Sequence, residues 1–125
     1  MAVARRRIDP QEGAAAVEAW REAAGPSSDG PVPRTILATA VRYTLEEVTA
    51  RAPGNSVEVR VPPFGVTQCV PGPRHTRGTP PNVVETDAAT WLAMVTGELS
   101  WAEAVAAHRV AASGLRADLS ALLPL

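Results

Sequence analysis

The sequence predicts a single-domain α/β protein, and three observations support that prediction. Over residues 34–52, apolar side chains recur at the spacing of one helical stripe, formed by Leu37, Val41, Leu45 and Val48. Residues 57–61 alternate strictly between apolar and charged side chains, which is typical of a half-buried strand. The chain has 125 residues, of which 46% are hydrophobic, and this is enough for one core of ordinary size.

The first helix is expected between Asp9, which can cap it, and Gly25-Pro26, which end it. The preceding residues 1–8 are expected to be a flexible tail, so that the domain spans residues 9–125. The run Arg5-Arg6-Arg7 in this tail can touch nucleic acid or anionic lipid, although a solvated terminus is the preferred interpretation.

Strands are expected in the middle of the chain and again near its end. Two β-prone runs flank the turn Pro62-Pro63-Phe64-Gly65, so residues 56–70 are expected to form a hairpin. Short runs bounded by turn residues predict further strands at residues 82–86 and 110–113.

The last third is expected to alternate helix with strand. A helix capped by Thr86 or Asp87 is expected to stop at Gly97. Ser100 and Glu103 have the spacing of a capping box, which opens a further short helix. A final helix is predicted from an apolar side made of Leu115, Leu119, Leu122 and Leu123.

Composition argues against several classes of protein. A net charge of −1 is not that of a general nucleic-acid binder. The single cysteine, Cys69, allows no internal disulfide and indicates a reducing compartment, so we expect a cytoplasmic location. No run approaches the roughly 20 apolar residues of a membrane span, and no signal peptide is recognisable after Met1. Integral membrane association is therefore not expected.

Candidates for catalysis are few. Cys69 and His75 are six residues apart across a Pro-Gly-Pro turn, and a thiol nucleophile needs a base nearby. A single cysteine on an apolar strand is more often a small core residue. Cys69, His75 and His108 do not have the spacing of a zinc site. No Gly-rich phosphate loop and no nucleophile motif are found in the sequence. The sequence predicts no catalytic residue, metal ligand or cofactor.

The segment Arg74-His75-Thr76-Arg77-Gly78 is the best candidate for a polar site. Two arginines and a histidine beside glycines can grip a carboxylate or a phosphate. The preferred alternative is that the arginines pair with Glu58 or Glu85 on neighbouring strands. Trp91 and Trp101 can wall a pocket, but tryptophans near capped helix starts are more often core or interface residues.

Small residues form a pattern in the last third of the chain. Gly97-Glu98-Leu99 precedes a short helix that holds Ala104, and a strand that ends in Gly114 follows before the leucine-bearing segment. In this arrangement residues 82–125 resemble the C-terminal half of sterol carrier proteins. With the stretch at residues 72–85, the whole chain looks like the short actinobacterial branch of that family.

The resemblance implies a mainly antiparallel sheet of about five strands, covered on one face by helices, with a lipid tunnel between sheet and helices. Three features depart from the family pattern. His108 stands where a glycine is usual, and residues 62–81 are unusually rich in proline. The sequence ends in Leu123-Pro124-Leu125, which is not a peroxisomal address of the Ser-Lys-Leu type.

The leading hypothesis is a lipid-transport role, in which the protein binds an apolar or amphiphilic small molecule such as a fatty acyl, isoprenoid or sterol-like lipid. The apolar walls are expected at the sheet and at residues 34–52 and 115–123, with an anionic head group at residues 72–78. The candidate ligand-binding residues are Arg74, His75, Arg77, Leu37, Val41, Trp91, Leu115 and Leu119.

Two alternatives stay open. One is an accessory domain or relative of thiol-dependent isomerases, which would use a polar site made of Arg74, His75 and Arg77. The other is a non-enzymatic protein-interaction module with a filled core, able to form a homodimer. We expect no enzyme activity from this chain, because no catalytic motif is found in it.

Overall fold

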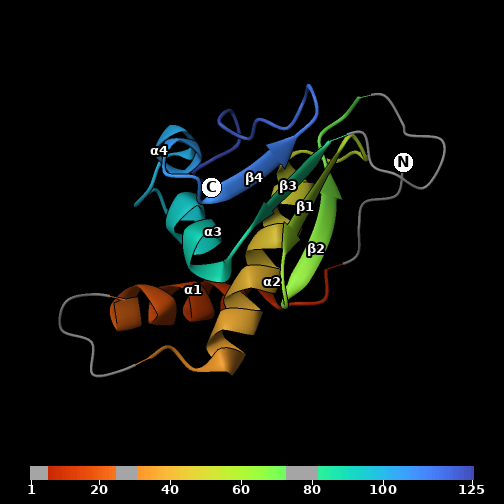
Figure 1. The fold of residues 1–125 in the computed structure, drawn as a ribbon. Coiled ribbons are helices and arrows are strands. Elements are labelled where there is room, and N and C mark those ends of the chain that lie inside the picture. Colours follow the sequence, from red (N-terminus) through yellow and green to blue (C-terminus); the bar gives the residue numbers. More distant parts are fainter. Residues whose placement is uncertain (1–5, 25–30, 73–81) are drawn as a thin grey trace.

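The computed structural model describes residues 6–24, 31–72 and 82–125. Its elements in chain order are α1 (Pro10–Ala24), α2 (Arg34–Arg51), β1 (Val57–Val61), β2 (Gly65–Cys69), β3 (Val83–Thr86), α3 (Ala88–Val95), α4 (Trp101–Ala106) and β4 (Val110–Ser113). Helices and one sheet combine in an α+β fold (Figure 1), which confirms the expected mixture of elements.

The strands that the structure describes form one sheet in the order β2-β1-β3-β4. β1 is antiparallel to β2, with Val59 opposite Thr67, and parallel to β3, with Val59 opposite Val84. β4 is antiparallel to β3. The described residues form four strands where about five were expected, and the sheet is mainly but not purely antiparallel, because two of its three strand pairings are antiparallel and one is parallel.

The parallel pairing follows from where the chain returns to the sheet. β2 finishes at the end where β1 begins, since Val57 lies opposite Cys69. Asn82, just before β3, is bound at the same end: its Nδ2 donates to the Ser56 carbonyl at 2.8 Å, and its carbonyl accepts from the Glu58 N–H at 2.9 Å. A strand that enters the sheet there runs in the direction of β1.

The two faces of the sheet differ in character. Val57, Val59 and Val61 of β1 are fully buried, whereas Glu58 and Arg60 lie on the opposite, partly exposed face. In Figure 1, α2 lies along the back of the sheet, α1 crosses one end of α2, and α3 and α4 lie toward β3 and β4. The strict alternation read from the sequence thus gives one sheet face that packs on the helices.

Helices α3 and α4 begin where their sequence signals predict. The Asp87 carboxylate accepts a hydrogen bond of 2.8 Å from the Thr90 N–H at the start of α3. Ser100 and Glu103 form a reciprocal capping box at the start of α4. Each cap satisfies backbone N–H groups that have no partner inside the helix.

The predicted final helix over residues 115–123 is wrong. After β4 the chain turns at Gly114, whose φ is 105°, and continues as irregular turns. The Asp118 carboxylate accepts from the Ser120 N–H at 2.8 Å, a local bond that competes with helical backbone bonding. Leu119 still reaches the core from this segment, and the Leu125 N–H donates to the Val95 carbonyl at 3.0 Å.

Candidate functional site

Three of the predicted ligand-binding residues lie outside the described residues: Arg74, His75 and Arg77. The expected head-group site and the isomerase-like polar site both depend on them, so both stay predictions. Glu58, which was one of their two expected partners, accepts a hydrogen bond from Nε of Arg60 on its own strand.

The apolar residues predicted to wall a tunnel lie in three different environments. Val41, Trp91 and Leu119 are 0% exposed, so each packs against other atoms on all sides. Leu37 is partly buried against the core, whereas Leu115 is 105% exposed. The described structure does not bring these five side chains to a common cavity.

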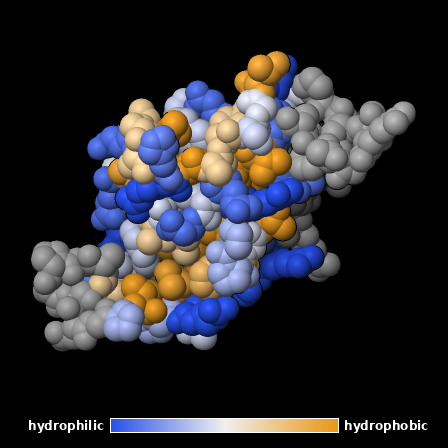
Figure 2. Space-filling view, viewed as in Figure 1, coloured by the Kyte–Doolittle hydropathy of each residue, from blue (hydrophilic) through white to orange (hydrophobic). Residues whose placement is uncertain are grey.

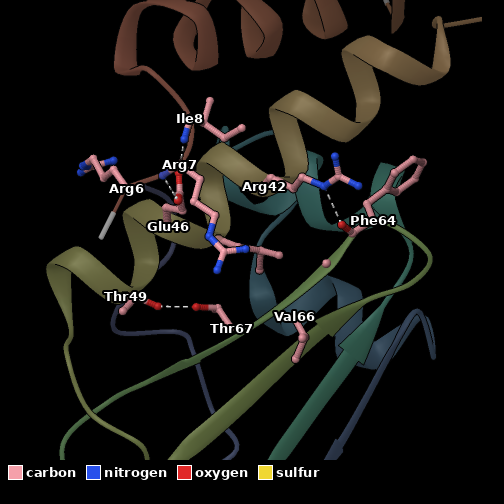
Figure 3. Close-up of a pocket in the computed structure, with 11 residues that line it drawn as sticks. Arg6, Arg7, Ile8, Arg42, Glu46, Thr49, Phe64, Val66 and Thr67 are labelled. Carbon is pink, nitrogen blue, oxygen red and sulfur yellow. Dashed lines mark hydrogen bonds between the residues drawn. The ribbon is translucent and has the colours of Figure 1, made fainter. Parts of the chain in front are cut away.

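A groove lies between α2 and β2, at the edge of the sheet (Figure 3), and its volume is about 860 Å³. We call it the α2–β2 groove. Helix α2 lines it with Arg42, Leu45, Glu46 and Thr49, and the hairpin lines it with residues 64–67. The remaining wall is residues 6–8, which we call the N-terminal arm.

Gly65 keeps this groove open on the strand side. It occupies an inward-facing position of β2, opposite the buried Val61. A Cβ placed on Gly65 would point at α2, 3.2 Å from Leu45 Cδ1 and 3.7 Å from Arg42 Cγ. A larger side chain here would therefore fill space between α2 and β2.

Hydrogen bonds between α2 and the hairpin fix the two long walls. Arg42 Nε donates to the Phe64 carbonyl at 2.9 Å. The Thr49 hydroxyl donates to the Gln68 carbonyl at 2.8 Å and is also hydrogen-bonded to the hydroxyl of Thr67. These contacts span the length of β2, so the groove is formed before any ligand enters.

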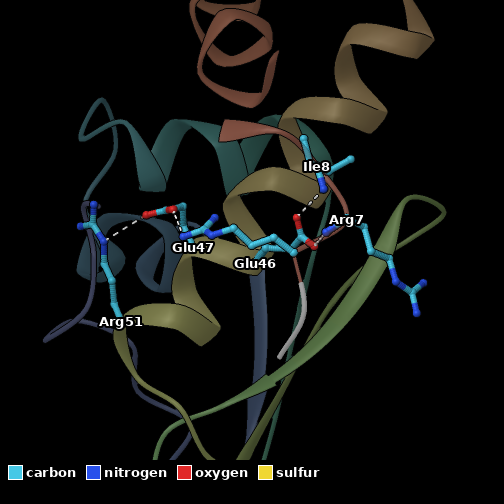
Figure 4. A network of polar contacts seen from close by, with 6 residues as sticks. Arg7, Ile8, Glu46, Glu47 and Arg51 are labelled. Atoms are coloured by element: carbon cyan, nitrogen blue, oxygen red, sulfur yellow. Dashed lines mark hydrogen bonds and ion pairs between the residues drawn. The ribbon is translucent and has the colours of Figure 1, made fainter. Parts of the chain in front are cut away.

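Glu46 holds the N-terminal arm across α2. Its carboxylate accepts hydrogen bonds from the backbone N–H groups of Arg7, at 2.6 Å, and Ile8, at 3.0 Å (Figure 3). Next to it, Glu47 pairs with Arg6 and, at 3.4 Å, with Arg51 (Figure 4). Residues 6–8, expected to belong to a tail, therefore lie against folded protein.

Positive charge outweighs negative charge around the groove. Its lining includes Arg6, Arg7 and Arg42 but one carboxylate, that of Glu46. The charge of Arg6 is offset by Glu47. Within residues 6–24, 31–72 and 82–125, neither Arg7 nor Arg42 is in an ion pair. The groove thus presents two guanidinium groups that are able to meet an anion.

The chemistry of Cys69 is that of a core residue. It is a free, buried cysteine, and burial raises the pKa of its thiol from 9.0 to about 11. A thiol with that pKa is protonated and unreactive at neutral pH. No cluster of three or more His, Cys, Asp and Glu side chains that could hold a metal ion occurs in the described part of the chain.

A second hollow, of about 540 Å³, lies near the starts of α3 and β4. Its polar groups are engaged locally, because the Asp87 carboxylate caps α3 and Arg109 Nε donates to the Thr90 hydroxyl at 3.1 Å. His108 beside it has a φ of 57°, in the left-handed region that glycine adopts most easily. The glycine that the resemblance to sterol carrier proteins leads us to expect at this position would adopt this conformation more easily than histidine.

Comparison with protein families identifies the family of this chain. The family described as bacterial SCP ortholog, where SCP stands for sterol carrier protein, matches residues 33–125. The chain belongs to this family. Membership in the sterol carrier family indicates lipid binding or carriage in general. A search of curated proteins finds no match. The family region contains α2 and the hairpin, whereas the N-terminal arm and α1 precede it.

The helix and the hairpin that the hydrophobic pattern predicts in the family region are present as α2 and as strands β1 and β2. None of the described helices is both long enough and apolar enough to cross a membrane.

Sequence reasoning missed the α2–β2 groove. Arg7 and Ile8 were assigned to the tail, and the one signal there was the arginine run, which was considered able to touch anionic lipid. Gly65 was interpreted as a turn residue, although the structure places it at the first position of β2.

Proposed function

We propose that this sterol carrier family member is a non-enzymatic binding protein for an apolar small molecule, with fatty acyl, isoprenoid and sterol-like lipids as candidate ligands. The ligand lies in the α2–β2 groove. The observation that carries this proposal is the groove itself, whose volume of about 860 Å³ matches that of small-molecule sites, roughly 300–1,000 Å³.

The composition of the groove supports an apolar occupant. Leu45, Ile8 and Phe64 contribute apolar surface from three separate segments of the chain. Burial of a methylene group against such surface contributes about 0.8 kcal/mol, so an alkyl chain gains affinity with each carbon that it places there. Of the residues first expected to wall a tunnel, Val41, Trp91 and Leu119 are packed in the core, which makes the groove the better location.

Filling the groove is the direct test. Gly65→Leu adds a side chain at the inward position of β2, and Gln68→Leu places the same leucine side chain at an exposed position of the same strand, where it replaces a side chain of similar size. We expect Gly65→Leu to weaken displacement of Nile red by dodecanol about tenfold, since two lost methylene contacts are worth about 1.6 kcal/mol. Gln68→Leu is expected to bind as the wild type does.

A second measurement uses the wild type alone, so that the proposal can still be tested if Gly65→Leu does not fold. Dodecanol added to the ¹⁵N-labelled wild type should shift the amide resonances of Leu45 and Phe64 and leave those of α4 unchanged. Shifts confined to other regions, or no binding of Nile red and dodecanol by folded wild type, would contradict the proposed function.

A second candidate is a protein-interaction module, favoured by the complete burial of Val41, Trp91 and Leu119 in a filled core and by the full exposure of Leu115. On the face of the molecule drawn in Figure 2, however, apolar residues fall in several areas separated by hydrophilic side chains. Light scattering distinguishes the two candidates: a homodimer that Leu115→Ser disrupts would favour the module.

A further inference from the structure

The N-terminal arm is a part of the groove that lies outside the sterol carrier region of the chain. The family match begins at residue 33, whereas Arg7 and Ile8 line the groove from a segment that precedes α1. This wall therefore comes from a part of the sequence that lies outside the region matched by the family.

The anchoring of the arm leaves the Arg7 side chain available. Glu46 binds the arm through the backbone N–H groups of Arg7 and Ile8, and not through the guanidinium group. In Figure 3 the Arg7 side chain extends along the groove between α2 and the hairpin, whereas Arg6 points away from it. The neighbouring Arg6 is held by Glu47.

Arg42 provides a second cation on the helix side of the groove. Its Nε donates to the Phe64 carbonyl at 2.9 Å, which fixes the direction of the side chain. The N–H groups on its two terminal nitrogens remain able to donate, because one guanidinium group carries five donors in all. The hydrogen bond to Phe64 thus fixes the position of Arg42, and the hydrogen bond from its backbone N–H to Glu46 fixes the position of Arg7.

We propose that the N-terminal arm makes this groove selective for single-chain amphiphiles with a carboxylate head group. Arg7 binds the carboxylate through charge-assisted hydrogen bonds, the positive charge of Arg42 on the helix wall adds to the attraction, and the alkyl tail lies on Leu45 and Phe64. The positive balance of charge at the groove complements the anion. This inference rests on the proposed function, because it assumes that the groove takes an alkyl chain.

The test compares an acid with its alcohol. Dodecanoate and dodecanol compete with Nile red on the wild type, on Arg7→Gln and on Arg60→Gln, a control that removes an equal charge from the far face of the sheet. We expect Arg7→Gln to weaken dodecanoate about tenfold, the effect of losing one charge-assisted hydrogen bond, and dodecanol less than twofold. Arg60→Gln should change neither. Arg7→Lys, which keeps the charge, should restore most of the affinity for the acid.

Each further outcome bears on the proposal in a definite way. Acetate, which has the head group without a tail, should not displace the probe, and displacement by acetate would show a bare anion site instead. Equal losses for acid and alcohol in Arg7→Gln would overturn the selectivity and leave the binding function standing. Failure of both ligands to bind folded wild type would overturn the proposed function as well.

Discussion

The indole N–H of Trp91 donates a hydrogen bond of 2.8 Å to the hydroxyl of Thr44 in the middle of the core. Both side chains are buried, at 0% and 3% exposure. The Thr44 hydroxyl donates in turn to the Ala40 carbonyl at 2.8 Å. Trp91, which the sequence offered as a pocket wall, is therefore a core residue whose one polar group is satisfied by α2.

The variant Thr44→Val measures how much the hydrogen bond between Trp91 and Thr44 contributes to the free energy of unfolding. Valine keeps the shape of threonine but leaves the buried indole N–H without an acceptor, which costs about 1–3 kcal/mol. Thr44→Ser keeps the acceptor and loses one methyl group, so it should cost about 1 kcal/mol. Urea unfolding with an unchanged m-value measures both. A Thr44→Val protein as stable as the wild type would show that the bond contributes nothing.

The docking of α1 on α2 depends on Gly13. A Cβ placed there would lie 2.1 Å from Cγ and 2.7 Å from Cβ of Tyr43, near the rigid base of that side chain. Helix propensity alone predicts that Gly13→Ala stabilises by about 1 kcal/mol, whereas overpacking costs about 1–3 kcal/mol. At such distances the overpacking term is expected to be the larger, so the variant should be less stable.

A double variant separates the two effects of Gly13→Ala. In a Tyr43→Ala background the crowding is gone and only the propensity remains. The same Gly13→Ala change should then raise the free energy of unfolding instead of lowering it. If the sign is the same in both backgrounds, contact with Tyr43 is not what requires a glycine.

Local signals were sufficient for much of the fold. The capping box of Ser100 and Glu103, the cap at Asp87 and the alternation over residues 57–61 are each read from a few neighbouring residues, and each element formed as predicted. The prediction of a final helix was wrong because it also rested on a local pattern alone. The leucine spacing at Leu115 and Leu119 looked helical, but the decisive contact is the turn that Asp118 forms with Ser120.

The candidate site could not be read in this way, because it is a product of tertiary structure. Ile8, Leu45 and Phe64 come together from the arm, α2 and the hairpin, and no motif links them in the sequence. The role of the interior residues was ambiguous in the sequence for a related reason. An apolar stripe such as that of Val41 looks the same whether it packs against a sheet or lines a tunnel, and only the packing decides.

The raised pKa of Cys69 gives the protein a specific sensitivity to alkali. The folded state holds this thiol proton up to a pKa of about 11, against 9.0 for an unburied thiol. Between these values unfolding releases a proton, so stability falls as pH rises through that window, by on the order of 3 kcal/mol in all. Below pH 9 the group is protonated in both states and has no such effect.

Cys69→Ala isolates this contribution, since it removes the titrating group and leaves the other ionisable groups in place. At pH 8 the variant should be less stable than the wild type, because a buried group is lost. The gap should shrink as pH rises toward 11, when urea midpoints of the two proteins are compared. A gap that does not change with pH would mean that the thiol titrates as an exposed one.

The attachment of the N-terminal arm yields the last prediction, through the matched pair Glu46→Gln and Glu47→Gln. The Glu46 carboxylate accepts from the backbone N–H groups of Arg7 and Ile8, while the Glu47 carboxylate forms ion pairs with the side chains of Arg6 and Arg51. One amide oxygen replaces two charged acceptors in Glu46→Gln, so the arm should detach more often. Hydrogen exchange at the Arg7 and Ile8 amides should then accelerate about fivefold or more, as expected for a loss of about 1 kcal/mol at an exposed site. Glu47→Gln removes exposed ion pairs worth about 0.2–1 kcal/mol but leaves both backbone bonds in place, so it should accelerate those amides much less. Equal acceleration in the two variants would mean that general charge attraction, and not the two backbone bonds, holds the arm on α2.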